Sequence, residues 1–270
     1  MTAPQGRLAG KVAFVAGGSS GINLGIARRF AEEGAKVAII SRNPERVQAA
    51  TAELAELGPA FGTPADVRDY AAVEAALKAV RERFGEIDIV VSGAAGNFVA
   101  PALGMSANGF KTVVDIDLIG TFNVYRACFE HLRKPGASLI SISAGQAVRA
   151  SLNQAHVCAA KAGVNMLTQC LALEWGPAGV RVNAISPGPI SGTEGMARLA
   201  PTPEAEARVK NRVALRRYGE KEEIAEMAVF LSTEQASYVN GAIIPVDGGS
   251  GAGDASGNAI PEQFGRAAAS

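Results

Sequence analysis

The sequence has few cysteines and histidines, no excess of either charge and no long apolar segment. Its 270 residues include three cysteines without a CxxC pair and only two histidines, so we expect no metal site. Cys128, Cys158 and Cys170 are therefore predicted to be reduced thiols. Lysine plus arginine equals aspartate plus glutamate, 26 each, which excludes a global field that would attract nucleic acid. An anionic ligand must be bound by a local cluster of charge.

The apolar runs are short, and neither end resembles a targeting signal. Runs such as "KVAFVAGG" and "AKVAIIS" are far below the roughly 20 residues that cross a bilayer, so no membrane partner is expected. The start, "MTAPQGRLAGK", lacks the charged head and apolar stretch of a secretory signal. The end, "AAAS", is not a peroxisomal address of the Ser-Lys-Leu type. These features favour a cytoplasmic protein.

Apolar β-branched runs alternate with helical patterns along the whole chain. Helical segments such as "NLGIARRFAEEGA" space apolar residues three and four apart and end at glycine. This alternation predicts an α/β fold, namely a single Rossmann-like domain with a doubly wound parallel sheet and helices on both faces. The seven predicted strands lie near 11–16, 36–41, 60–65, 87–92, 137–143, 180–186 and 242–246.

Nothing in the sequence divides the chain into several domains. We find no internal repeat and no Pro/Ser-rich linker, so residues 1–249 are predicted to form one nucleotide-binding domain. Residues from about 190 to 218 interrupt the alternation as an irregular insertion, of the sort that often covers a ligand. The tail, residues 250–270, is rich in Gly, Ala and Ser, and is predicted to be disordered or ordered only by packing on a neighbour.

A glycine-rich loop follows the first predicted strand. The segment "AGGSSGINLGIARRF" leads from that strand into a helix, where glycines let the backbone approach a pyrophosphate and the helix N-terminus stabilises its charge. An ordinary tight turn also uses glycine, but this position favours a nucleotide site. The G-x-G-x-x-G spacing is not met, which indicates a different loop. The predicted contacts are Gly17, Ser19, Ser20, Gly21 and Ile22.

The ends of the second and third strands predict which nucleotide is bound. An NAD site usually has an acid after the second strand, but Ser41 and Arg42 stand there. A guanidinium binds a 2′-phosphate through charge-assisted hydrogen bonds, so NADP(H) is favoured over the alternative that Arg42 is merely solvated. Asp66 and Val67, after the third strand, are placed to meet the adenine.

Those residues, with "SGAAGN", "DIDLIGTFN", Lys161 and "ISPGPISGT", resemble the short-chain dehydrogenase/reductase family from Lys11 to about Gly249. The resemblance implies a homo-oligomer, a dimer or tetramer that pairs the fifth and sixth helices. It also implies further cofactor contacts, which are Ala94, Ala95, Gly96, Lys161, Pro187, Gly188, Ile190 and Thr193.

The sequence departs from that family at its catalytic positions. Family enzymes generally use an Asn, Ser, Tyr, Lys set, with the tyrosine four residues before the lysine. Counting back from Lys161 gives Val157, so the phenol that protonates a carbonyl oxygen is missing. The asparagine position holds Asp117, and the serine position holds Ala144, with Ser143 beside it as a possible catalytic hydroxyl.

Four separated stretches resemble one branch of the family. "AAGNF", "FKTVVDIDLIGTFNV", "LEWGP" and "PGPISGTEGM" are together similar to the 2,4-dienoyl-CoA reductases, especially the peroxisomal type, which also lacks the tyrosine and has the aspartate. The resemblance implies NADPH-dependent reduction of a 2,4-dienoyl-CoA to the 3-enoyl thioester, an auxiliary step of fatty acid β-oxidation. The alternatives are an oxidoreductase of this family acting on a carbonyl or enoyl thioester, and a non-catalytic NADP-binding relative.

This interpretation assigns catalytic roles to Asp117 and Lys161. Lys161 would hold the nicotinamide ribose, favour the developing enolate and, with Asp117, orient a water that protonates the α-carbon. Asn97 and Phe98 would line the acyl pocket, although a plain loop explains them nearly as well. His156 is interpreted as a packing residue, because its spacing from Lys161 need not place both on one helical face.

A basic cluster in the insertion could receive the phosphates of an acyl-CoA substrate. Arg208 and Arg212 are the predicted contacts, because a chain without net charge needs a local patch for this ligand. A solvated basic helix face is an equally good explanation. The cluster consists of Arg208, Lys210, Arg212, Arg216 and Arg217.

Overall fold

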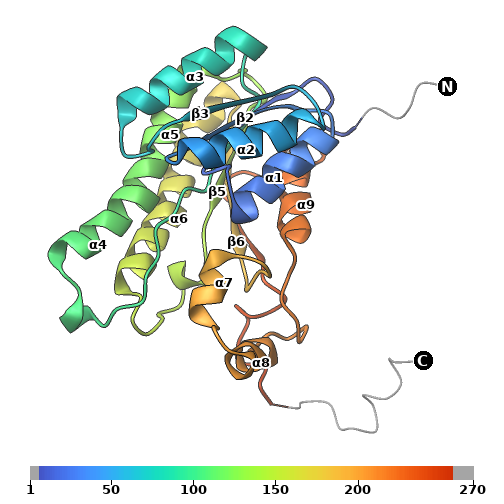
Figure 1. The fold of residues 1–270 in the computed structure, drawn as a ribbon. Coiled ribbons are helices and arrows are strands. Elements are labelled where there is room, and N and C mark those ends of the chain that lie inside the picture. Colours follow the sequence, from blue (N-terminus) through green and yellow to red (C-terminus); the bar gives the residue numbers. More distant parts are fainter. Residues whose placement is uncertain (1–5, 258–270) are drawn as a thin grey trace, which may run out of the picture.

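A computed structural model describes residues 6–257 and shows one seven-stranded parallel sheet between two layers of helices (Figure 1). The strand order is β3-β2-β1-β4-β5-β6-β7. All seven predicted strands are present, with ends shifted by at most a few residues. They are β1 (Val12–Ala16), β2 (Lys36–Ser41), β3 (Ala60–Pro64), β4 (Ile89–Ser92), β5 (Ser138–Ile142), β6 (Arg181–Pro187) and β7 (Ile243–Val246).

The sheet is apolar on both faces because helices cover both. Every residue of β1, β4 and β5 is buried, which explains their continuous apolar runs. One layer contains α1, α2 and α9, and the other contains α3, α5 and α6. The α-helices are α1 (Gly21–Glu32), α2 (Pro44–Ala55), α3 (Tyr70–Phe84), α4 (Ala107–Val114), α5 (Gly120–Cys128), α6 (Ala155–Trp175), α7 (Glu194–Leu199), α8 (Pro203–Arg212) and α9 (Lys221–Leu231).

The strand order reverses beside β1, and this reversal places the ligand crevice. After β3 the chain returns to the other side of β1, so β1 pairs with both β2 and β4. In open parallel sheets, ligands bind outside the carboxyl ends of the strands at such a switch point. The predicted Rossmann-like architecture is confirmed.

The insertion, which interrupts the alternation of strands and helices, contains two helices of its own. It folds into α7 and α8, which lie together beyond the sheet (Figure 1). Thr193 and Thr202 cap these helices by accepting hydrogen bonds from backbone N–H groups of the first turn, and Pro203 starts α8. The insertion returns to its own starting point, since Ser191 N donates to Gly219 O at 2.9 Å.

The tail can be followed to residue 257. Asp247 accepts hydrogen bonds from the backbone N–H groups of Gly249 and Gly251, and Arg216 donates to the carbonyl of Gly257. This part of the tail is therefore held against the insertion. The remainder, residues 258–270, and residues 1–5 lie outside the described part of the chain, and the tail prediction is untested there. Within residues 6–257, no helix combines the length and apolarity that crossing a membrane requires.

Candidate active site

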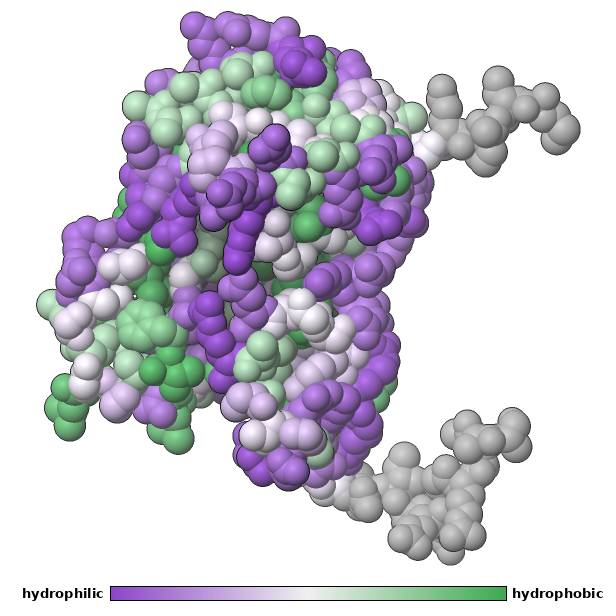
Figure 2. Space-filling model, viewed as in Figure 1, coloured by the Kyte–Doolittle hydropathy of each residue, from purple (hydrophilic) through white to green (hydrophobic). Residues whose placement is uncertain are grey.

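A cavity of about 1740 Å³ opens at the carboxyl ends of the strands. Figure 2 shows the hollow on the face that carries α7 and α8, with hydrophilic residues gathered along its rim. Pockets for drug-sized ligands are roughly 300–1,000 Å³, so this cavity has room for a dinucleotide and a second ligand together. Among residues 6–257, no group of three His, Cys, Asp or Glu side chains is placed to hold a metal ion.

The glycine loop forms one wall of the cavity and is shaped for an anion. Gly17 has φ +80°, and a Cβ there would lie 2.9 Å from the Ala94 backbone, so only glycine fits. The side chain of Ser20 does not cap α1, whereas Asn43 and Asp69 cap α2 and α3. The first N–H groups of α1 are thus left for a ligand, as a pyrophosphate site requires.

Asn23 explains why the loop departs from the usual glycine spacing. Its Nδ2 donates to the carbonyl of Gly93 at 2.7 Å, which ties the first turn of α1 to the end of β4. A Cβ on Gly93 would clash with the Asn23 amide, so this contact needs glycine at the end of β4. At the position where the family loop has its last glycine, the side-chain amide of Asn23 therefore makes a hydrogen bond that links α1 to the end of β4.

The residues predicted to select the nucleotide line the same cavity. Ser41 and Arg42 do so, and Arg46 lies nearby with an ion pair to Glu194 at 3.2 Å. Asp66 also lines the cavity. Hydrogen bonds from Arg68 are the largest effect on its carboxyl and hold the pKa of that carboxyl below the usual range. An ionised Asp66 is an acceptor suited to an amino group such as that of adenine.

Asp117 and Lys161 meet in the interior beside the cavity. Lys161 Nζ donates to the carbonyl of Ile142 at 2.9 Å and lies 3.2 Å from Asp117 Oδ2. Asp117 Oδ1 accepts from Gly96 N at 2.7 Å. Lys161 lines the cavity wall, whereas Asp117 is 1% exposed and stands behind Lys161 and Gly96. The predicted pair therefore exists, with only the lysine facing a ligand directly.

Local backbone geometry brings this pair together. Asp117 lies on η2 (Asp115–Ile119), a π-helical turn between α4 and α5, and such turns are frequent at functional sites. Gly163 of α6 lets Leu118 of η2 approach, since a Cβ there would lie 2.7 Å from Leu118 Cδ2. The close approach of η2 and α6 sets the reach between Asp117 and Lys161.

No tyrosine is among the described residues that line the cavity. Val157, at the position of the missing phenol, is buried and packs with Val113 and Ala160. Tyr125 is fully buried, and that burial raises the pKa of its phenol, which is hydrogen-bonded to Ser141 at 2.8 Å. Ser143 lines the cavity and donates from its hydroxyl to the side-chain oxygen of an asparagine on α6. Among the described residues, the cavity is thus lined by Lys161 of a buried ion pair and by no phenol.

Matches with known proteins decide the family. The chain matches the family described as enoyl-(acyl carrier protein) reductase over residues 16–251. It is 45% identical over 244 residues to the peroxisomal (3E)-enoyl-CoA-producing 2,4-dienoyl-CoA reductase of Rattus norvegicus, covering 89% of this chain and 83% of that protein. The chain belongs to the short-chain dehydrogenase/reductase family. The resemblance found in the sequence is thereby confirmed.

Proteins with other names are also similar to this chain. The D-threitol dehydrogenase of Mycolicibacterium smegmatis is 39% identical over 246 residues, covering 90% of this chain and 94% of that one. The crystal structure of levodione reductase superposes with a TM-score of 0.86 at 34% identity, covering 91% and 99% of the two chains. Since relatives with different names share the fold, the residues of the site must distinguish their substrates.

The predicted acyl-pocket residues of this short-chain dehydrogenase/reductase separate in the structure. Asn97 lines the cavity, and its backbone carbonyl accepts from Arg198 of α7 at 2.9 Å. Phe98 is not among the lining residues and packs on His156, with ring centroids 4.3 Å apart. His156 is completely buried, which agrees with its interpretation as a packing residue.

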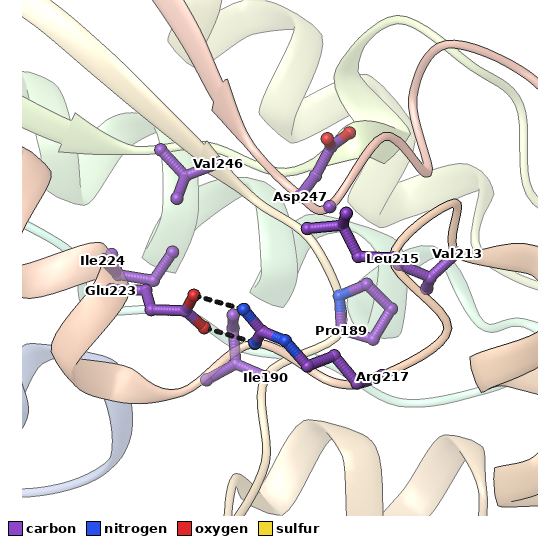
Figure 3. A pocket seen from close by; sticks show the side chains of 11 residues that line it. Pro189, Ile190, Val213, Leu215, Arg217, Glu223, Ile224, Val246 and Asp247 are labelled. Atoms are coloured by element: carbon purple, nitrogen blue, oxygen red, sulfur yellow. Dashed lines mark hydrogen bonds and ion pairs between the residues drawn. The ribbon is translucent and has the colours of Figure 1, made fainter. Parts of the chain in front are cut away.

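The predicted basic cluster does not act as one patch. Arg212 lines the cavity, but Arg208 is exposed and is not among the lining residues. Lys210 forms an ion pair with an acid of its own helix, Glu206, at 2.5 Å. Arg217 pairs with Glu223 at 2.7 Å, beside a separate pocket of only about 40 Å³ (Figure 3). Local pairing thus neutralises much of the positive charge that the sequence suggested.

Most of the predicted nucleotide contacts come together on the cavity wall. Gly96 is the exception, since its N–H holds Asp117 from behind the wall. The predicted residues that line the cavity are Gly17, Ser19, Ser20, Gly21, Ile22, Ser41, Arg42, Asp66, Val67, Ala94, Ala95, Lys161, Pro187, Gly188, Ile190 and Thr193.

Sequence reasoning missed a second group of residues that line the cavity. These residues come from the segment between β5 and α6 and from α7, where no spacing pattern predicts which side chains turn inward. The only signal was the abundance of polar side chains in a loop at a strand's carboxyl end. They include Gln146, Arg149, Gln154, Met196 and Arg198.

Proposed function

We propose that this protein reduces 2,4-dienoyl-CoA thioesters to 3-enoyl thioesters with NADPH, as an auxiliary enzyme of fatty acid β-oxidation. The observation that carries the proposal is the buried Asp117–Lys161 pair beside a cavity that no tyrosine lines in the described structure. A phenol is needed where a carbonyl oxygen is the final proton acceptor, but not where the proton is finally added to carbon. The names of the rat protein and of further relatives agree with this chemistry.

NADP(H) is the proposed cofactor, and the cavity fits it. The uncapped start of α1 and Gly17 would hold the pyrophosphate, and Ser41 with Arg42 the 2′-phosphate. Lys161 would hold the nicotinamide ribose, and the segment after β6, residues 187–193, the carboxamide end. When bound, the nicotinamide supplies a hydride to the far end of the diene.

The protein's own charges then act on the substrate. After hydride addition, negative charge spreads to the thioester oxygen, and the ammonium of Lys161 stabilises that charge in a site shielded from bulk water. Asp117 holds the lysine in place, and Lys161 orients a water that protonates the α-carbon. Asp117 is in this scheme a positioning residue, because Lys161 and Gly96 separate it from the cavity.

Coenzyme A is the proposed carrier of the acyl chain. Arg212 and Arg149 both line the cavity and lie close enough to Asp254 to lower the pKa of its carboxyl, after the larger effect of hydrogen bonds from Ser256. Two exposed guanidinium groups in the lining of the cavity suit the phosphates of coenzyme A. Arg208 would then contribute only general attraction.

One spectrophotometric assay tests the proposal. NADPH oxidation is followed at the nicotinamide absorbance with 2,4-hexadienoyl-CoA, with a 2-enoyl-CoA and with a 3-ketoacyl-CoA. We expect turnover of the dienoyl thioester well above that of the other two. Preferential turnover of the ketoacyl or enoyl thioester would contradict the proposal, as would tight NADPH binding without any turnover.

We further propose that the protein is a cytoplasmic homo-oligomer, a dimer or tetramer. Helices α5 and α6 present exposed apolar side chains, among them Phe122, Met166 and Leu173. Met166 and Leu173 lie seven residues apart on one face of α6, and such an apolar stripe on a monomer typically marks an interface. The cytoplasmic location rests on the sequence and stays a prediction.

A further inference from the structure

The side-chain amide of Gln154 is buried at the cavity with half of its hydrogen-bonding capacity unused. Gln154 is 3% exposed, and its Oε1 accepts from Gln146 Nε2 at 3.0 Å. Its Nε2 has no hydrogen-bond partner, although it is inaccessible to solvent. A buried amide donor without a partner costs about 1–3 kcal/mol, so a specific reason is needed for keeping it there.

Some of the unpartnered polar atoms of the described residues lie at this cavity, and others, such as those of His131 and Tyr218, lie elsewhere. Within the described residues, the buried side-chain atoms at the cavity without a hydrogen-bond partner include Asn23 Oδ1 and Asn97 Oδ1 in addition to Gln154 Nε2. Asn23, Asn97 and Gln154 all line the cavity. Of these three atoms, only Gln154 Nε2 is a hydrogen-bond donor.

Helix geometry aligns Gln154 with Lys161. Gln154 is the residue preceding α6, and Lys161 follows it by seven positions, which is close to two full turns. Both side chains line the same cavity, whereas Val157 between them turns toward Val113 of α4. Lys161 and Gln154 therefore belong to the same stretch of the cavity lining, where a small turn of the Gln154 side chain would bring its buried Nε2 to a ligand.

We propose that Gln154 Nε2 donates a hydrogen bond to the thioester carbonyl oxygen of the substrate, with Gln146 as the positioning residue that fixes the amide's orientation. This inference rests on the proposed function. The bond strengthens as hydride addition moves negative charge onto that oxygen, so the amide stabilises the enolate more than the bound substrate. No proton is transferred to the oxygen, which remains free to return its charge to the α-carbon when that carbon is protonated.

The test combines turnover with a spectroscopic readout of the carbonyl. Hydrogen bonding to the carbonyl oxygen lowers the energy of the π→π* transition, so a bound dienoyl thioester should absorb at longer wavelength. We would record the difference spectrum of 2,4-hexadienoyl-CoA bound in the presence of NADP⁺, which does not allow turnover. The variants are Gln154→Met, which has similar length without a donor, and Gln154→Glu, which has only acceptors when ionised. Gln48→Met, on the exposed face of α2, is the matched control.

For both Gln154 variants we expect the red shift to disappear and kcat to fall about 100-fold, with unchanged NADPH affinity. Gln146→Met should reduce the red shift only in part and lower kcat about 10-fold. Gln48→Met should change neither the red shift nor kcat. If wild type fails to reduce the dienoyl thioester, the proposed function is wrong. If wild type is active but Gln154→Met keeps its red shift, Gln154 does not contact the carbonyl. If one variant fails to fold, the other decides the outcome.

Discussion

At the scale of single residues, the pair of Asp117 and Lys161 stands out because its burial is unfavourable. Burying an ion pair costs desolvation energy that the attraction between the two charges rarely offsets. Such a pair therefore contributes little to stability, which suggests that it has a functional role. The ammonium has three donors, of which one goes to the carbonyl of Ile142 and one faces Asp117. The third remains for a ligand in the cavity, which fits a role for Lys161 at both the ribose and the enolate.

Replacing Asp117 by asparagine tests the pair with little change in shape. Asparagine is the usual residue of the family at this position, and its amide oxygen could still accept from Gly96 N. We expect Asp117→Asn to lower kcat for the dienoyl thioester about 100-fold or more, because the charge that holds Lys161 is lost. NADPH affinity, measured by fluorescence titration, should change little.

The matched control is Asp115→Asn on the same π-helical turn, where the carboxylate pairs with Lys111 near the surface. This variant should keep wild-type turnover. Equal losses in both variants would mean that the turn itself, rather than the charge of Asp117, is required.

Arg42 determines the proposed nucleotide preference at the same scale. Arg42→Ala should raise KM for NADPH by about 10-fold or more, because charge-assisted hydrogen bonds to the 2′-phosphate are each worth about 1.5–3 kcal/mol. KM for NADH should stay the same, since NADH lacks this phosphate. Steady-state kinetics with NADPH and with NADH give the ratio of the two KM values. Arg46→Ala, whose guanidinium is already paired with Glu194, is the control and should leave the ratio almost unchanged.

At the scale of secondary-structure elements, close packing at glycines sets the site. Gly163 lets α6 approach η2, and Gly120 lets the start of α5 approach Val67, where a Cβ would lie 2.5 Å from a methyl carbon. Neither glycine needs a left-handed backbone, so their role is space rather than conformational freedom. The π-helical turn inserts an extra residue into the helical path and so turns Asp117 toward α6.

An ion-pair network joins the segment before β1 to α1 and α9. Glu33, just after α1, accepts from the Arg7 backbone at 2.9 Å and from its guanidinium at 2.6 Å, and Arg29 adds a further contact. Hydrogen bonds from Arg7, the first cause, lower the pKa of Glu33 to about 2 from the ordinary 4.5. A carboxyl whose pKa is lower in the folded state stabilises the fold above its unfolded pKa and loses that effect as pH falls toward the folded value.

Glu33→Gln should therefore destabilise the protein in a pH-dependent way. Near neutral pH we expect the free energy of unfolding to fall by about 1–2 kcal/mol, a value reduced for the partial exposure of Arg7. The difference from wild type should vanish between about pH 4.5 and 2, where wild-type Glu33 becomes protonated. Urea unfolding across this range measures it. Glu32→Gln, which removes a surface ion pair with Arg28, should differ little from wild type in its free energy of unfolding at every pH. A loss of stability in Glu33→Gln that does not depend on pH would contradict the ionic explanation.

At the scale of the whole molecule, the topology assembles one cavity from distant segments. The loop after β1, the ends of β2 and β4, the start of α6 and the insertion all meet beyond the sheet. The insertion adds a second wall, because Arg198 of α7 donates to Asn97 and Arg46 of α2 pairs with Glu194 of α7. Closing of the cavity thus depends on contacts between parts that are far apart in sequence.

Assembly into an oligomer is a prediction at the same scale. Leu173 is 80% exposed on α6, and Leu173→Glu places a charge in the proposed apolar interface. We expect this variant to form a smaller oligomer than wild type. Light scattering after size-exclusion chromatography measures the molecular mass of each oligomer. Leu57→Glu, at a partly exposed leucine beyond α2, should keep the wild-type mass. A wild-type protein that is monomeric would refute the proposed interface.

The sequence by itself determined the strands, the glycine loop and the residues that gather around the nucleotide cavity. Strands of a parallel sheet are buried on both faces, so they appear as continuous apolar runs, and a loop such as residues 17–21 needs particular residues at particular backbone angles. Local rules of this kind can be read along the chain. The absence of the phenol at Val157 was equally visible, because its spacing from Lys161 is fixed by one helix.

Only the tertiary structure decided which polar side chains line the cavity. The basic cluster of the insertion was divided by local pairing, since Lys210 contacts Glu206 and Arg217 contacts an acid of α9. Gln154 and Arg149, which no motif indicated, lie on the cavity wall. The physical reason is that a side chain's partner depends on segments brought near it by folding, and neither charge nor spacing along the sequence specifies that neighbour.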